Sequence, residues 1–128
     1  MSIRVIRLGT PRERGEGLRI GTVRRPPRGV RKADYARQDW FDVWLPDVAP
    51  SASLMRQTAI LEDRRNWQTF ARRYQAELKQ PEPSRLLDLL AALSHQTNLS
   101  IGCYCADEQY CHRSLLRRAL QERGADLA

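Results

Sequence analysis

The second half of the chain alternates between helical and extended hydrophobic patterns, and this alternation restricts the folds that it can adopt. Over residues 67–78, apolar side chains recur at three- and four-residue steps, which predicts a helix with one apolar face. A further helix is predicted over residues 86–93, a buried strand over 98–103 and a last helix around 115–120. Strands that alternate with helices favour α/β layering with an at least partly parallel sheet.

Extended segments are also predicted in the first half, where β-branched and aromatic residues are frequent. These strands are expected at residues 3–8, 18–23 and 40–45. A chain of 128 residues suits one domain. We therefore expect a single compact α/β domain over residues 1–128, in which helices flank a small, mostly parallel sheet.

Hydroxyl side chains and prolines set the expected helix boundaries. Ser51 or Ser53 is predicted to cap a helix that runs to about Arg65. Two prolines just before Ser84 are expected to end the preceding helix, and Ser84 is predicted to be the N-cap of the next one.

The charge balance of the chain is strongly basic. Its formal net charge is +7 at pH 7, which favours an anionic partner such as a nucleic acid, a nucleotide, a phosphate ester or an acidic protein. The alternative is a basic protein from an arginine-rich proteome, since Lys32 and Lys79 are the only lysines among the 22 basic residues.

Hydrophobicity and cysteine usage indicate the compartment. No apolar run approaches the roughly 18 residues that a membrane span needs, so no membrane partner is expected. The N-terminal segment lacks the apolar stretch and cleavage site of a signal peptide. Three clustered cysteines are not typical of a disulfide framework, and they indicate reactive or metal-binding thiols in a reducing compartment. We expect a cytoplasmic protein.

The three cysteines fall within nine residues, where a predicted strand runs into the last helix. If the strand continued through Cys103 and Cys105, the two thiols would point the same way. Cys111, His112 and Arg113 then open the helix, where free N–H groups and the helix dipole lower the pKa of a thiol. One hypothesis makes Cys103 or Cys111 a nucleophile and His112 its acid–base partner. Arg113 would then bind an anion.

Two other interpretations of this segment remain open. Three thiols and an imidazole are enough to ligate zinc, although their spacing is not that of a standard zinc finger or ribbon. The ligands in that case are Cys103, Cys105, Cys111 and His112. In a purely structural interpretation, Cys103 is a small buried hydrophobic residue and Arg113 pairs with a carboxylate of the preceding loop.

A second group of candidates lies in the arginine-rich segment over residues 19–29. Arginines at a strand end beside a proline–glycine turn are suited to hold phosphate or carboxylate with two hydrogen bonds. Arg24 and Arg28 are the candidates in this segment. The alternative is a basic loop that is simply solvated.

The chain resembles the bacterial and archaeal domain of unknown function 488 family. The resemblance rests on an apolar strand that ends in Cys103, a short acidic loop, and a Cys-His-Arg helix start at residues 111–113. The middle of the chain is similar to the YeaO-like branch of that family, most specifically in the Pro-Arg-Gly sequence at residues 27–29. The resemblance covers nearly the whole chain.

The resemblance implies a compact α/β domain of enzyme-like character, with candidate residues at the matching positions. These positions are Arg24, Arg28, Ser51, Cys103, Cys111, His112 and Arg113. Two departures stand out: the YeaO-like branch usually has Asn-His where this chain has Cys111-His112, and many relatives have Glu where this chain has Cys105. The second change removes a potential general base and adds a thiol, which favours metal or redox chemistry.

Together these observations predict an enzyme-like domain that binds an anionic, phosphate- or nucleotide-like ligand. Arg24, Arg28 and Ser51 are expected to bind the ligand, and the Cys/His/Arg segment to supply reactivity. The alternatives are a zinc-binding structural module and a basic nucleic-acid-binding protein without catalysis.

Overall fold

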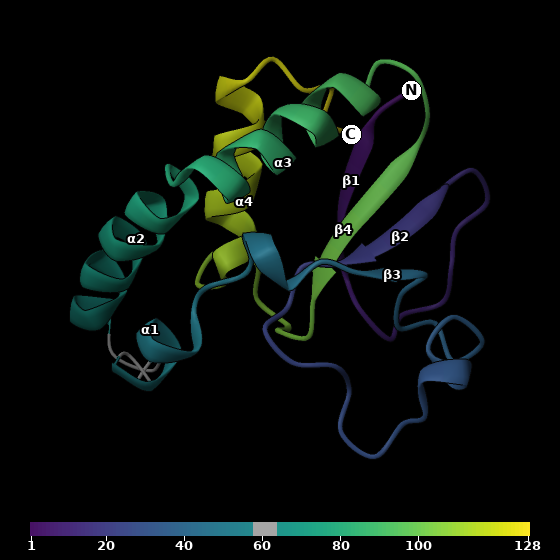
Figure 1. Cartoon of the computed structure of the whole chain (residues 1–128). Helices are drawn as coiled ribbons and strands as arrows, with labels where there is room; N and C mark the ends of the chain where they lie inside the picture. Colours follow the sequence, from purple (N-terminus) through teal and green to yellow (C-terminus); the bar gives the residue numbers. More distant parts are fainter. Residues whose placement is uncertain (58–63) are drawn as a thin grey trace.

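The computed structural model describes residues 1–57 and 64–128 of the chain (Figure 1). In chain order, its elements are β1 (Ile3–Arg7), β2 (Leu18–Gly21), η1 (Lys32–Asp34), β3 (Val43–Trp44), η2 (Pro46–Val48), α1 (Ala52–Gln57), α2 (Arg64–Leu78), α3 (Pro81–Leu93), β4 (Leu99–Cys103) and α4 (His112–Glu122), where η denotes a 3₁₀ helix.

The described strands form one sheet in the order β1-β4-β2-β3, and every neighbouring pair is parallel. β4 is a central strand, and all five of its residues are buried. The predicted α/β fold is confirmed, and the sheet is parallel throughout these strands. Because parallel strands point the same way, their carboxyl ends meet at one edge, which we call the carboxyl edge.

α2, α3 and α4 lie together on one side of the sheet (Figure 1). The predicted apolar face of residues 67–78 is confirmed, since Phe70, Tyr74 and Leu78 are all at most 3% exposed and belong to the main core. Residues from the strands and from α3 and α4 complete this core. Within the described residues, no helix combines the length and hydrophobicity that crossing a membrane requires.

The third strand is shorter than predicted, because β3 spans only Val43–Trp44 instead of residues 40–45. Phe41 is buried and packs so closely on Gly21 that a Cβ at that glycine would overlap the Phe41 ring. Asp39 has a φ of +62°, a left-handed conformation that turns the backbone just before this segment. The aromatic residues that suggested a longer strand are therefore used for packing outside it.

The start of α3 differs from the prediction that Ser84 is its N-cap. The helix begins at Pro81, and Gln80 is the N-cap residue. Proline suits the first turn of a helix because its missing N–H would have no partner there. Ser84 instead lies inside the helix, and its N–H donates to the Gln80 carbonyl at 3.0 Å. The prolines therefore open α3 as well as separating it from α2.

Ser51 caps α1, as the sequence predicted. Its hydroxyl oxygen accepts a hydrogen bond from the Leu54 N–H at 3.1 Å, which is the N-cap to N3 contact. α1 is described as far as Gln57. Part of the longer helix predicted up to Arg65 falls on residues 58–63, which lie outside the described residues.

A smaller apolar cluster occupies the carboxyl edge. Its buried members are Leu8, Val23, Phe41, Cys103 and Cys111. The segment after β2, α1 and the first turn of α4 all lie at this edge (Figure 1). The cysteines are therefore placed where loops from several strands meet, which is the usual position of ligand sites in parallel α/β sheets.

Candidate metal centre and ligand pocket

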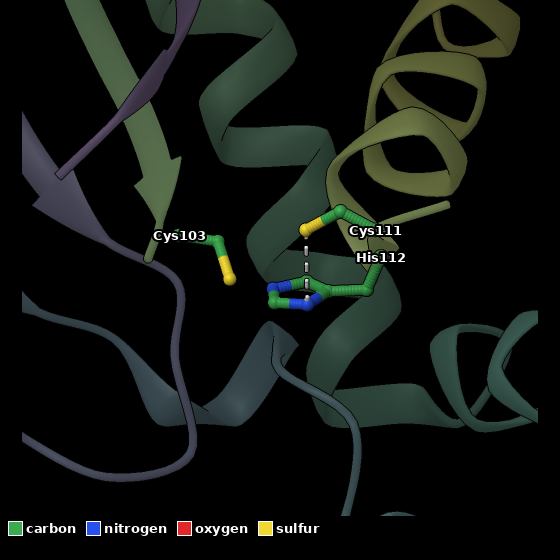
Figure 2. Close-up of side chains that lie close together, drawn as sticks. All are labelled: Cys103, Cys111 and His112. Atoms are coloured by element: carbon green, nitrogen blue, oxygen red, sulfur yellow. Dashed lines mark hydrogen bonds between the residues drawn. The ribbon is translucent and has the colours of Figure 1, made fainter. Parts of the chain in front are cut away.

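Two cysteines and a histidine converge at the carboxyl edge. Cys103 ends β4, Cys111 is the N-cap residue of α4, and His112 is the first residue of that helix. One potential ligand atom from each of the three lies within 4.8 Å of the other two. Figure 2 shows both thiols and the imidazole gathered in the space between the end of β4 and the start of α4.

Cys105 joins this cluster although β4 ends before it. The strand stops at Cys103, so the two thiols are not aligned by continuous extended backbone. The loop nevertheless brings the two Sγ atoms to 3.8 Å, with the Cys103 thiol donating to Cys105. We call Cys103, Cys105, Cys111 and His112 the thiol–imidazole cluster.

Contacts on both sides fix the His112 ring. Its Nε2 lies 2.6 Å from the Thr22 carbonyl oxygen. Since a carbonyl only accepts, Nε2 carries a proton and donates, and neutral His112 keeps its lone pair on Nδ1. Nδ1 lies 3.9 Å from Cys111 Sγ, and the ring meets Tyr74 edge-on at a centroid distance of 5.7 Å. The free lone pair is therefore available to a proton or a metal ion on the thiol side.

The thiols differ in their tendency to ionise. The hydrogen bond from Cys103 lowers the pKa of Cys105 to about 3, and Cys111 and the charges of Arg113 and Arg7 act in the same direction. The same contact raises the pKa of Cys103, which remains the donor. A hydrogen bond from Cys103 also lowers the pKa of Cys111, with a further contribution from His112. The cluster thus favours the thiolate form of Cys105, to which the other two thiols can donate.

A pocket of about 320 Å³ opens beside the cluster. Cys103, Cys105 and His112 line it, whereas Cys111 is fully buried behind them. The lining residues also include Arg24, Arg25 and Arg56, and none of the lining residues that the structure describes is Asp or Glu. The volume suits a small ligand, and the lining charge is positive.

The side chains of Arg24 and Ser51 near this pocket make internal hydrogen bonds. Arg24 donates to the carbonyl oxygens of Pro46, Ala49 and Pro50 at 2.9–3.2 Å. The Ser51 hydroxyl donates to the Glu77 carboxylate. Both side chains therefore hold the chain around α1 in place, and Arg24 also lines the pocket.

The structure does not bring Arg28 and Arg113 into the pocket. Arg28 lines a separate groove. Arg113 is 3% exposed and donates to the carbonyl oxygens of Ile6 and Cys105 at 2.7 and 2.6 Å. It pairs with no carboxylate among the described residues, because Glu108 pairs with Arg117 instead.

Three features of the pocket were not predicted by sequence analysis. Cys105 was considered there as a metal ligand or redox thiol, and the structure places this half-buried thiol on the pocket wall. Arg25 follows Arg24 in the arginine-rich segment and carried no separate signal. Arg56 comes from α1, where nothing in the pattern distinguishes it from a solvated arginine.

The fold and the cluster define a small parallel α/β domain with cysteine and histidine side chains at its carboxyl edge. A family model described as DUF488-N3a, the active DUF488-N3 subclade, matches residues 3–124. The chain therefore belongs to the DUF488 family, as the resemblance predicted. The "Uncharacterized protein YeaO" of Escherichia coli (strain K12) is 35% identical over 91 residues, which cover 70% of this chain and 74% of that protein. No solved structure gives a significant match.

Proposed function

We propose that this chain is an enzyme-like metal-binding domain that holds zinc through Cys103, Cys111 and His112, beside a pocket for a small anion. The observation that carries this proposal is the convergence of the three ligand atoms within 4.8 Å. Two thiols and an imidazole are preferred zinc ligands, and the choice of zinc follows from that donor set.

The spacing of the side chains fits a tetrahedral ion. Zinc–sulfur and zinc–nitrogen bonds of about 2.3 and 2.0–2.1 Å place neighbouring ligand atoms about 3.6–3.8 Å apart. The distance from Cys111 Sγ to His112 Nδ1 is 3.9 Å. The Thr22 carbonyl holds the other ring nitrogen, which is the usual way in which a ligating histidine is oriented.

Three protein ligands leave one coordination position for water or a substrate, as in catalytic zinc sites. Cys103 and His112 line the pocket, so the open position would face it. Zinc bound there would act as a Lewis acid, and Arg25 and Arg56 would attract an anionic substrate. The description of the matched family as an active subclade agrees with chemistry at this site.

Metal content of purified protein tests the proposal directly. We expect about one equivalent of zinc in protein purified without chelator, and thiolate-to-metal charge-transfer absorption after substitution with Co²⁺. Cys103→Ser, Cys111→Ser and His112→Ala should each reduce zinc affinity by more than the 10–100-fold that is typical when a residue hydrogen-bonded to a metal ligand is lost.

Matched controls separate ligation from general damage. His95→Ala changes an exposed histidine that contacts Gly124 and Asp126, and it should retain zinc. Cys105→Ser should also retain one equivalent, because Cys105 lies outside the three-residue set. Bound metal below about a tenth of an equivalent in the wild-type protein, with stability indifferent to chelator, contradicts the proposal.

A second candidate function is thiol chemistry at Cys105, and one observation favours it. Cys105 combines a pKa lowered to about 3 with a position on the pocket wall. An accessible thiolate is the reactive form of cysteine. In this alternative, Cys105 attacks an electrophilic substrate held by the pocket arginines.

A further inference from the structure

A second, larger groove lies along the carboxyl edge beside the metal pocket. Its volume is about 700 Å³, within the range of ligand sites. It is lined by the loop that follows β1, by residues 25–28 after β2, by Trp40 and by Tyr104. Arg25 and Tyr104 line both cavities, so the groove and the pocket share a wall.

The charged lining of the groove is entirely basic. Arg7, Arg25 and Arg28 line it, and no Asp or Glu of residues 1–57 or 64–128 does so. None of the three forms an ion pair in the part of the chain that the structure describes, in contrast to Arg12 and Arg117, which both do. Arg7 Nε donates to the Tyr104 carbonyl oxygen at 3.1 Å, which holds this arginine at the groove wall. Guanidinium groups that face one concavity without a carboxylate partner are suited to bind phosphate, which an arginine can contact with two hydrogen bonds.

Two aromatic rings complete the groove. Trp40 and Tyr104 meet edge-to-face, with centroids 5.8 Å apart and an interplanar angle of 77°. Trp40 packs on Gly9, where a Cβ would lie 2.8 Å from the indole ring. The Tyr104 hydroxyl donates to the Arg25 carbonyl at 2.9 Å. Packing and hydrogen bonding thus hold both rings in place beside the arginines.

We infer that this groove binds a nucleotide unit, whose base stacks on Trp40 or Tyr104 and whose phosphate contacts Arg7, Arg25 and Arg28. Flat aromatic rings next to unpaired arginines are the combination that recognises a base together with its phosphate. An inorganic anion would use the arginines but not the rings. The inference does not depend on zinc, since it involves none of the proposed ligands.

A nucleotide unit is present both in free nucleotides and in single strands, and the test distinguishes them. The probes are 5′-AMP, adenosine, inorganic phosphate and an oligonucleotide of eight adenylates, titrated at low salt by calorimetry. We expect 5′-AMP to bind with a Kd of about 1 mM or better, and adenosine and phosphate to bind at least about tenfold more weakly. The octamer offers eight repeated units, which alone raise its apparent affinity roughly eightfold. If its affinity exceeds that of 5′-AMP by more than this factor, the nucleotide unit that the groove recognises belongs to a single strand. Otherwise it is a free nucleotide.

Variants locate the binding. Arg28→Ala should weaken 5′-AMP binding about tenfold and, for the octamer, reduce the salt dependence by about 0.7 in the log–log slope. Trp40→Leu should weaken binding of both about tenfold, and Trp40→Phe should restore part of the loss. Arg118→Ala and Trp44→Leu are matched controls, because both residues are exposed and line other cavities.

Three results overturn the inference: no detectable binding of 5′-AMP or of the octamer, equal affinity for 5′-AMP and phosphate, or wild-type binding by both Arg28→Ala and Trp40→Leu. Arg28 is exposed and makes no ion pair among the described residues, so its variant should fold normally even if Trp40→Leu does not. Loss of binding in Cys111→Ser at unchanged stability would also contradict it, because the groove should act without the metal.

Discussion

The buried guanidinium of Arg113 stabilises the backbone that carries the thiol–imidazole cluster. Its two hydrogen bonds join the end of β1, at the Ile6 carbonyl, to the loop after β4, at the Cys105 carbonyl. Hydrogen bonds from a charged donor contribute about 1.5–3 kcal/mol, so this contact fixes the position of Cys105. The positive charge also lowers the pKa of the Cys105 thiol. Arg113 therefore acts on the cluster through the loop and through its charge, while its side chain lies outside the pocket.

The reactivity of Cys105 is predicted to be nearly independent of pH in the metal-free protein. The pKa of Cys105 is lowered to about 3, and the largest cause is the hydrogen bond from Cys103. The thiol is therefore ionised throughout the pH range 5–8. An ordinary cysteine, with a pKa of about 8.5, loses about tenfold in alkylation rate per pH unit over the same range. Mass spectrometry of iodoacetamide-treated protein, site by site, measures the difference.

Cys103→Ala serves as the comparison, because it removes the donor that stabilises the Cys105 thiolate. Alkylation of Cys105 should then fall as the pH drops below neutrality. In the wild-type protein, the stability that the Cys105 thiolate contributes should be fully present above the unfolded pKa of about 8.5, and it should be lost as pH falls toward the lower pKa of the folded state. A wild-type Cys105 that titrates like a free cysteine would rule out the thiol candidate.

The sequence predicted the part of the site that lies on regular elements, because strands and helices have periodic hydrophobic patterns. A buried strand that ends at Cys103 and a helix that begins at His112 are both regular, so their meeting at the carboxyl edge followed from fold class. The role of Cys105 did not follow, because its side chain depends on a loop that has no repeating pattern. The separation of Arg28 from Arg24 has the same cause, since a proline-rich loop carries the two to different cavities.

At the scale of elements, two hydrogen bonds between Ser51 and Glu77 connect the start of α1 to α2. The Ser51 hydroxyl and N–H both donate to the Glu77 carboxylate, while the hydroxyl oxygen caps α1. Ser51→Ala should therefore lower the free energy of unfolding by about 1–3 kcal/mol, since it removes an N-cap and a hydrogen bond to a charged group. Urea denaturation followed by circular dichroism provides the measurement.

Ser53→Ala is the matched control for this substitution. Ser53 is the second residue of α1, two positions after the N-cap Ser51, and it is exposed, so its loss should change the unfolding free energy by less than about 0.5 kcal/mol. Equal effects of the two substitutions would show that the contact between Ser51 and Glu77 adds nothing to stability. If the Ser51→Ala variant retains zinc, the role of Ser51 is confined to stabilising α1.

Elements whose apolar residues lie in the main core were predicted most accurately from the sequence. β4 and the end of α2 were predicted accurately, because each contributes a regular apolar set to the main core, whereas α2 begins at Arg64, in residues that had been assigned to the preceding helix. β3 was overestimated, since Phe41 resembles a strand residue but fills the cluster at the carboxyl edge. The start of α3 was placed too late, because proline suits both a break and a first helical turn.

At the scale of the whole molecule, the metal centre would join the last strand to the last helix. A ligand that binds only the folded state stabilises it by about 2.7 kcal/mol at 100 times its Kd. For a chain of this size, zinc should then raise the Tm by about 8–10 °C. Thermal unfolding of chelator-treated protein, with and without added zinc, tests this prediction.

The double variant Cys103→Ser/Cys111→Ser should show no such shift with zinc, and magnesium should not shift the wild-type protein. Oxygen ligands suit magnesium, and the cluster offers only sulfur and nitrogen. A zinc effect of equal size in the double variant would assign the stabilisation to adventitious surface binding.

The position of β4 in the sheet has a consequence for the order of assembly. Leu99 pairs with Ile3 on one side and with Leu18 on the other, across separations of 96 and 81 residues. β1 and β2 do not pair with each other, since β4 lies between them. During synthesis, β1 and β2 therefore cannot pair with β4 until the last quarter of the chain has been made. Long-range pairing of this kind slows folding. The growing chain would leave apolar strand edges open to chaperones or to other chains for most of its time on the ribosome.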